Sequence, residues 1–210
     1  FAQCGLFRGP FSIEAALEVV VTEEDSLQLL EQLCDHSMLQ TWTATEDPGL
    51  QLFETLRVYA LEQLDALGLR AETEKRYRRQ VQAHSRRLLE AVDNTESVES
   101  MEALRRSAPD ILQAFTLTLR HEPVEAPAFL EPLRLIVGPT RAMRARVQET
   151  LDALPSWAPP IARGEALIQA ARFDWEHPDV DAEPQLRELL ELAQALGDRL
   201  FLGRVHQLLC

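Results

Sequence analysis

"LFETLRVYALEQLDALG", residues 52–68, is the stretch that decides the fold. It begins as the end of a strand and continues as a helix, because apolar residues recur at helical spacing: Leu56, Tyr59, Ala60 and Leu64. Gly68 follows at the position where a left-handed residue ends a helix. The stretch therefore predicts a helix over residues 54–67.

The apolar surface of this predicted helix is too broad for one neighbour, since Leu61 and Leu67 extend it. We predict that one side closes an N-terminal core and that the other abuts the helices after Glu72. Tyr59 and Leu64 are then buried, and the two parts form one rigid unit.

The residues before this stretch predict two helices and a hairpin. "SIEAALEVVV", residues 12–21, has a Ser12 N-cap with Glu14 two positions later. Residues 23–40 form a second helix whose predicted stripe holds Leu27, Leu30, Leu33 or Cys34, and Met38. "TWTATEDPGLQLFETL", residues 41–56, predicts a β-hairpin around "EDPG". Helix, helix, hairpin, helix is the outline of a winged-helix domain over residues 1–70.

The residues from Glu72 onward are helical in pattern. Residues 71–93 place an apolar stripe on one helix, through Tyr77, Val81, His84 or Ser85, Leu88 and Val92. Breaks are expected near Pro109 and at Gly138-Pro139. The helical pairs that follow predict an α-solenoid of tetratricopeptide-like hairpins over residues 71–210. The predicted class is mainly α.

Composition and charge limit the function. The chain has 210 residues, a formal charge of −13, 46% hydrophobic and 6% aromatic residues. Such a charge disfavours general binding to polyanions and binding to an anionic membrane surface. Its cysteines, Cys4, Cys34 and Cys210, are isolated, so we expect reduced thiols and a cytoplasmic location. The sequence begins and ends in the middle of apolar helical patterns, and we therefore expect a fragment of a longer polypeptide.

Motifs for chemistry are missing from the sequence. It contains no G-x-x-x-x-G-K-[ST], G-x-S-x-G or H-E-x-x-H, so we expect no catalytic, cofactor-binding or metal-binding residues. "DWEHPDVD" is interpreted as a hydrated loop, with a weak Ca²⁺ site near Asp174–Asp181 as the alternative. The five histidines lack the spacing of metal ligands: His36, His84, His121, His177 and His206. His84 is expected to be a buried packing residue with one hydrogen bond.

The distribution of charge bears on DNA binding. Between Gly9 and Leu56 there are ten acidic residues and no Lys or Arg, so the second predicted helix would repel a duplex. One basic cluster follows and is expected on a solvated face or against the acidic segment: Lys75, Arg76, Arg78, Arg79, Arg86 and Arg87. Trp42 and Trp175 are interpreted as either core or partner-surface residues. Trp157, between Pro155 and Pro159, is interpreted as either a partner-surface residue or one that fixes a connection.

Several phrases resemble one family in order and spacing. "GLFRGPFSIEAALEVV", "LLEQLCDHSMLQ" and "LFETLRVYALEQLDALG" resemble the winged-helix end of bacterial STAND-type regulatory ATPases. "AHSRRLLEAVD" and "PDILQAF" resemble helices that follow it, with Ile111 where Asn is usual. "EALIQAARFDWEHPDVDAEPQLRELLELAQALGDRL" is similar to a tetratricopeptide repeat of this family. The resemblance is strongest over residues 5–68 and 162–204.

The resemblance implies a non-catalytic regulatory and protein-interaction fragment. It would couple nucleotide state to the sensing of a protein partner, or of a small ligand on the concave face of the repeats, and pack on the parent's own ATPase core. Related ATPases carry a Met-His-Asp triplet whose His reaches the nucleotide phosphate. Leu52, Phe53 and Glu54 occupy those positions here, and Phe53 cannot donate that hydrogen bond. The alternative is a DNA-binding winged-helix transcriptional regulator.

Overall fold

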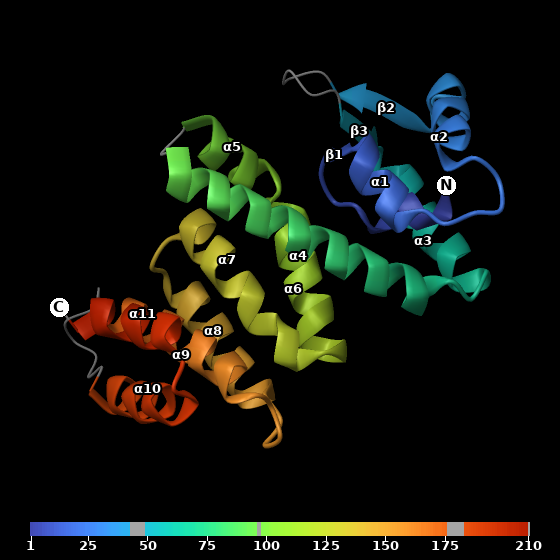
Figure 1. Cartoon of the computed structure of the whole chain (residues 1–210). Helices are drawn as coiled ribbons and strands as arrows, with labels where there is room; N and C mark the ends of the chain where they lie inside the picture. The colour runs from blue at the N-terminus through green and yellow to red at the C-terminus, as the bar shows by residue number, and fades with distance from the viewer. Residues whose placement is uncertain (43–48, 96–97, 176–182, 210) are drawn as a thin grey trace. The chain divides into compact units, whose positions relative to one another are not determined.

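The computed structural model describes residues 1–42, 49–95, 98–175 and 183–209. It is mainly helical with one small antiparallel sheet, as the sequence predicts (Figure 1). The chain divides into two compact units, Phe1–Leu117 and Thr118–Cys210. The helical residues between Gly68 and Leu117 thus group with the N-terminal elements. The domain boundary near residue 70 stays a prediction.

The first unit begins with short helices around a three-stranded sheet. Its elements are η1 (Ala2–Leu6), β1 (Phe11–Ser12), α1 (Ile13–Val19), α2 (Ser26–Asp35), β2 (Leu39–Trp42), β3 (Gly49–Leu52) and α3 (Glu54–Ala66). The strand order is β1-β3-β2, with Leu50 of β3 opposite both Phe11 and Thr41. The predicted pairing of β2 with β3 is confirmed, while residues 43–48 of the turn lie outside the described ranges.

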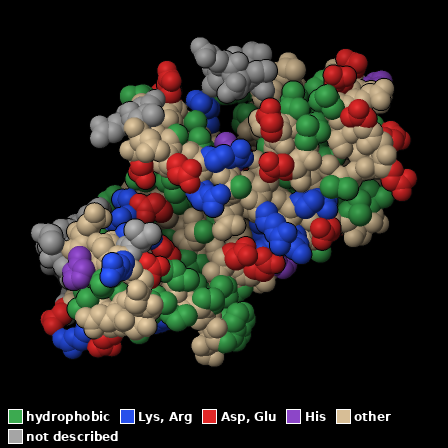
Figure 2. Space-filling view, viewed as in Figure 1, with side chains coloured by type: hydrophobic (Ala, Val, Ile, Leu, Met, Phe, Trp, Pro, Cys, Tyr) green, Lys and Arg blue, Asp and Glu red, His purple; other side chains and the backbone are tan. Residues whose placement is uncertain are grey.

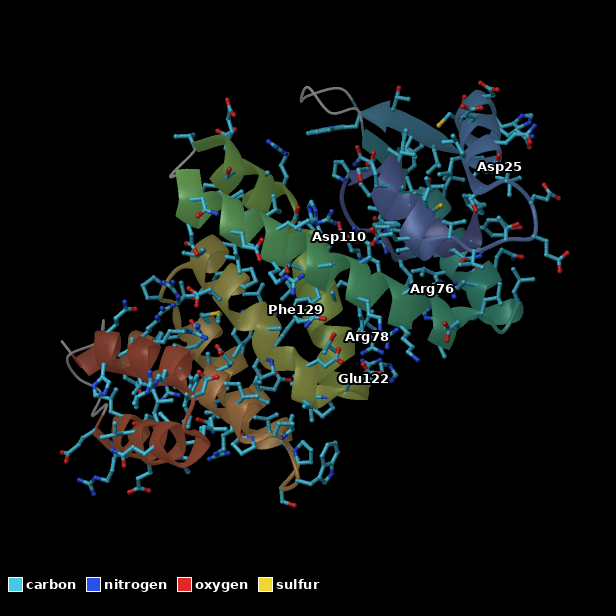
Figure 3. The ribbon with its side chains drawn as sticks, viewed as in Figure 1. Asp25, Arg76, Arg78, Asp110, Glu122 and Phe129 are labelled. Atoms are coloured by element: carbon cyan, nitrogen blue, oxygen red, sulfur yellow. The ribbon has the colours of Figure 1, made fainter. Side chains whose placement is uncertain are left out.

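Side chains and backbone geometry fix the helix ends. The hydroxyl of Ser12 accepts a hydrogen bond of 3.1 Å from the amide of Ala15, which confirms the predicted N-cap. Asp25 caps α2 in the same way, through the amide of Leu27 at 2.9 Å (Figure 3). Gly68 has φ +68° at the end of α3, a conformation that glycine adopts without strain.

Two predicted apolar faces differ from the structure. On α2, Leu30 is buried but Leu27 is exposed, and Met38, also exposed, lies beyond the helix because α2 ends at Asp35 rather than at residue 40. On α3, Leu64 is fully buried, whereas Tyr59 is 51% exposed, so the predicted burial of Tyr59 is wrong. The reason is that η1 covers only one side of α3, where a Cβ on Gly5 would come 2.9 Å from the Cβ of Ala60.

Three further helices complete the first unit: α4 (Arg70–Thr95), α5 (Val98–Arg106) and α6 (Ala108–His121), the last of which continues into the second unit. The predicted stripe of α4 is confirmed at Tyr77, Val81 and Ser85, which are all buried. The predicted break near Pro109 is also confirmed, because α5 ends just before it and α6 begins there. η1 and α1 pack against α4 (Figure 1).

The second unit consists of helices that pack on their neighbours in the chain. They are η2 (Pro123–Phe129), α7 (Leu130–Val137), α8 (Arg141–Ala153), α9 (Pro160–Trp175), α10 (Glu183–Leu196) and α11 (Arg199–Leu209). The predicted break at Gly138 is confirmed. One apolar cluster joins the last three helices: Leu167, Ile168, Leu189, Ala193, Phe201 and Val205. None of the helices in the described ranges combines the length and the apolar character that crossing a bilayer requires.

Candidate functional site

A buried carboxylate on α6 joins three segments of the first unit. Oδ1 of Asp110 accepts hydrogen bonds from the backbone amide of Arg8, at 2.8 Å, and from the hydroxyl of Tyr77, at 2.6 Å. Oδ2 accepts a third from the backbone amide of Gly9, at 3.0 Å. Asp110 therefore fixes the turn before β1 to α4 and α6. We call these four residues the Asp110 junction.

The local sequence explains how the junction forms. Asp110 lies in the first turn of α6, directly after Pro109, where a carboxylate suits the helix N-terminus. Gly9 allows the close approach of the backbone, because an added Cβ would lie 3.2 Å from Oδ2 of Asp110. The ring of Phe7 meets the ring of Tyr77 edge to face, with centroids 5.4 Å apart. The junction is thus polar at its centre and aromatic at its side.

The environment keeps the phenol of Tyr77 as a hydrogen-bond donor. Burial raises the pKa of Tyr77 well above its ordinary value, and the neighbouring carboxylate of Asp110 raises it further. Burial also raises the pKa of Asp110, although the hydrogen bonds from Tyr77, Arg8 and Gly9 favour the ionised form and oppose this rise. A protonated phenol and two amides facing one carboxylate form a satisfied buried network.

Two further contacts tie the N-terminal elements to the long helices. The guanidinium of Arg76 on α4 donates from Nε to the carbonyl of Val19, at 2.9 Å, and from Nη2 to Oε1 of Gln3, at 3.0 Å (Figure 3). The amide side chain of Gln113 on α6 donates to the carbonyl of Leu6, at 3.0 Å. The N-terminal elements are therefore joined to α4 and α6 by hydrogen bonds at several places.

The predicted basic cluster divides between two environments. Arg76 faces the N-terminal segment through the carbonyl of Val19 and the side chain of Gln3 rather than through an acidic side chain, and Arg78 is buried. Arg86 has a side chain that is 76% exposed and lies 3.8 Å from Glu90, as a solvated helix face would have it. Figure 2 shows lysine and arginine side chains gathered over α4, beside a region of α1 and α2 with mainly acidic ones.

His84 and Ser107 form the pair that most resembles a catalytic arrangement. Nε2 of His84 lies 3.2 Å from the hydroxyl of Ser107, but that hydroxyl donates its only proton to the carbonyl of Ala103, at 3.1 Å. With the hydroxyl directed at Ala103, Nε2 of His84 acts as the donor, whereas activation of a serine requires the imidazole to accept. The predicted single side-chain hydrogen bond of His84 is confirmed, but the side chain is half-buried rather than fully buried. Burial and the charge of Arg87 lower its pKa.

The second unit holds its own charge network around Glu131 of α7. The carboxylate of Glu131 accepts from Arg172 and Gln169 of α9, at 2.6 and 2.7 Å, and from Arg134, at 2.9 Å. Burial raises the pKa of Glu131, but these partners together bring it below its ordinary value. The network connects α7 to α9, and the carboxylate of Glu131 is already paired with side chains of the protein.

The predicted ion-binding loop is only partly described. Asp174 is buried and pairs with Nε of Arg144 at 3.0 Å, while residues 176–182, with His177, lie outside the described ranges. Among the residues that the structure describes, no three side chains of His, Cys, Asp or Glu come together as metal ligands would. The alternative of an ion site near Asp174–Asp181 stays a prediction.

The remaining sequence candidates are scattered. The guanidinium carbon of Arg106 lies over the ring of Trp42, 5.9 Å from the ring centroid. Trp157 is 76% exposed. Trp175 has no described side chain. Phe53 is the N-cap of α3 and is 42% exposed. Burial raises the pKa of the Cys4 thiol to about 11, which makes it unreactive; Cys210 is not described.

Asp110 is the residue that the sequence did not single out. An aspartate in a first helical turn after proline is usually a surface residue that interacts with the helix dipole, so the neighbouring sequence does not predict which groups it contacts. Arg8 and Tyr77 are 102 and 33 positions away from it. The one available signal is the buried stripe of α4, which places Tyr77 in a core where its hydroxyl needs a partner.

Comparisons with models of protein families, with curated proteins and with solved structures find no match for this chain.

Proposed function

We propose that the chain is a non-catalytic regulatory segment of a bacterial STAND-type ATPase. In this proposal a winged-helix domain, residues 1–70, precedes tetratricopeptide-like hairpins within residues 71–210. The order β1-α1-α2-β2-β3, with β3 between the other strands, supports the first part, since a winged helix pairs a short early strand with its hairpin. The successive packing of α7 on α8 and of α9 on α10 supports the second.

The Asp110 junction is the observation that carries the regulatory role. The segment that would pack on an ATPase core is hydrogen-bonded to α4 and α6 through a buried carboxylate, and a satisfied buried network makes the segments that it joins rigid. A displacement of η1 or β1 would therefore be transmitted to the long helices. Coupling of nucleotide state to partner sensing needs such a connection.

The partner surface follows from side chains left exposed on the N-terminal elements. Phe53, Val58 and Tyr59 of the α3 region are 42%, 52% and 51% exposed. Apolar side chains grouped on one helix are typical of a protein-facing surface, and the parent's own ATPase core is the partner we favour. A small ligand on the concave face of the repeats is part of the same proposal, as is a cytoplasmic location.

The alternative of a DNA-binding regulator is disfavoured by α2. This helix would be the recognition helix, yet Ser26–Asp35 contains no Lys or Arg and holds Glu31 and Asp35. A helix of this charge is repelled by phosphates.

The proposal is tested first on the gene. A phosphate-loop motif encoded in frame upstream of Phe1 is expected, and an unrelated upstream sequence would overturn the family assignment. The present chain should show no ATP binding by isothermal titration. In the longer protein, hydrogen exchange of α6 should differ between the ATP and ADP states. Asp110→Asn should abolish that difference, whereas Asp152→Asn, an exposed aspartate on α8, should keep it.

A further inference from the structure

An open cavity of about 450 Å³ lies on the first unit, beside the Asp110 junction. It is lined by residues from the turn after η1, from α3, from the start of α4 and from α6. The apolar part of its wall includes Leu61, Leu112 and Leu117. A volume of this size is typical of sites for small molecules, and four converging segments give it a defined shape.

Arg8 supplies the cavity with a cation in a fixed position. Its backbone amide is bonded to Asp110, and its Nε donates to Oε1 of Gln113, whose own amide nitrogen is bonded to the carbonyl of Leu6. Within the described residues, the two terminal nitrogens of this guanidinium have no hydrogen-bond partner. They form the edge of an arginine that can hold a carboxylate by two parallel hydrogen bonds.

The other charges of the cavity cancel one another. Nε of Arg70 donates to Glu74 at 2.7 Å, and its Nη1 donates to Asp65 at 3.1 Å, so Arg70 is already paired. The hydroxyl of Thr116 donates to the carbonyl of Leu112. The charge of Arg8 acts on the carboxylates of Asp110 and Glu54, but its terminal nitrogens are donors left for a ligand. The cavity therefore suits one negative charge rather than the several charges of a nucleotide phosphate chain.

We propose that this cavity binds a small organic monocarboxylate with an apolar body. The carboxylate lies on the guanidinium of Arg8, and the apolar body lies against Leu61 and Leu112. The fixed position of Arg8 lowers the ordering cost of binding. This site is distinct from the repeat face of the proposed function and does not depend on the ATPase parentage. A ligand there touches the turn after η1, α3, α4 and α6 at once and stabilises their arrangement.

The test uses the whole chain and two probes of the same shape, 4-phenylbutyrate and the neutral 4-phenylbutyramide. With about twelve non-hydrogen atoms, the carboxylate should bind with a dissociation constant on the order of 1 mM or lower. The amide should bind at least about tenfold more weakly, because it lacks the charge-assisted pair with Arg8. Amide chemical shifts of Arg8, Leu61 and Gln113 should move on titration.

Matched variants distinguish the site from general attraction of anions. Arg8→Gln should weaken binding of the carboxylate about tenfold or more, whereas Arg105→Gln, an exposed arginine on α5, should leave it unchanged. Leu112→Ala should weaken binding of both probes, since it shortens the apolar wall. Equal binding of the two probes, wild-type affinity of Arg8→Gln, or no saturable binding of 4-phenylbutyrate would each overturn the proposal.

Discussion

The phenol of Tyr77 donates a hydrogen bond of 2.6 Å to the carboxylate of Asp110, and both side chains are buried. Because the same carboxylate also holds the amides of Arg8 and Gly9, this one pair connects α4 to α6 and to the turn before β1. The first unit is therefore stabilised by a contact between segments that are far apart in the chain. Its elements should unfold together.

The chain's two tyrosines offer a matched test of this contact. Tyr77→Phe removes the hydroxyl and leaves the buried carboxylate of Asp110 without one donor, so the free energy of unfolding should fall by about 1–3 kcal/mol. Tyr59→Phe changes an exposed hydroxyl and should alter it by less than about 0.5 kcal/mol. Urea denaturation followed by circular dichroism measures both. Equal effects of the two variants would show that the hydrogen bond contributes nothing.

A second prediction concerns the core of α3. Leu64 is fully buried, so Leu64→Ala should destabilise the first unit by about 2–5 kcal/mol. Leu67→Ala, at a position that is 61% exposed, should change the stability by less than about 0.5 kcal/mol. Hydrogen exchange resolved by mass spectrometry should show that protection is lost in α1, α3, α4 and α6 together. If protection falls only before Gly68, the two parts are not one cooperative unit.

A third prediction concerns pH and His84. The pKa of His84 is lowered in the folded protein by burial and by Arg87, from an ordinary value of 6.5. The folded state then takes up the proton on His84 less readily than the unfolded chain does. The contribution of His84 to the free energy of unfolding is therefore complete above its pKa in the unfolded chain and is lost as the pH falls through its pKa in the folded protein.

The measurement compares wild type and His84→Gln by urea denaturation between about pH 7.5 and pH 5. The stability difference between them should shrink as the pH falls. His36→Gln, at an exposed position, should keep the wild-type pH dependence because His84 is still present. A pH-independent difference between wild type and His84→Gln would contradict the prediction.

Much of the fold could be predicted because it is encoded locally. The helix at 54–67 follows from apolar spacing and from Gly68, and the start of α1 follows from the hydroxyl of Ser12. The break at Pro109 follows from a missing amide proton. Each of these signals lies within a few residues of the feature that it determines.

The rest depends on contacts between distant segments. Tyr59 and Leu64 lie on one predicted apolar surface, and only the position of η1 decides which of them is buried. β1 has two residues, too few for an alternating pattern. Asp110 belongs to the candidate site because of residues far away in the chain, and single-sequence patterns contain no information of that kind.

A fourth prediction tests the acidic surface. Duplex DNA should not be retarded by the chain in gels at about 150 mM salt, since α2 offers no cation to phosphates. Weak retardation at low salt, through the exposed arginines of α4, should disappear as salt is raised. A shift that persists at about 150 mM salt would favour the DNA-binding alternative.

The last prediction concerns the packing of α9 with α10 and α11 in the second unit. A Cβ on Gly164 would lie 2.4 Å from Cζ of Phe201 and 3.1 Å from Cδ2 of Leu192, so an alanine there would force the buried ring of Phe201 to shift. Gly164→Ala should therefore destabilise this unit by about 1–3 kcal/mol through overpacking.

Gly203 provides the control, because a Cβ there meets nothing within 4 Å and the residue lies inside α11. Gly203→Ala should stabilise the unit by about 0.5–1 kcal/mol, since alanine loses less backbone entropy in a helix. In a double-mutant cycle, Phe201→Leu should cost less in the Gly164→Ala background than in wild type, because leucine relieves the clash. Additive effects of these two substitutions would mean that α11 does not pack on Gly164, and the close helix packing that supports a tetratricopeptide-like repeat would then be absent.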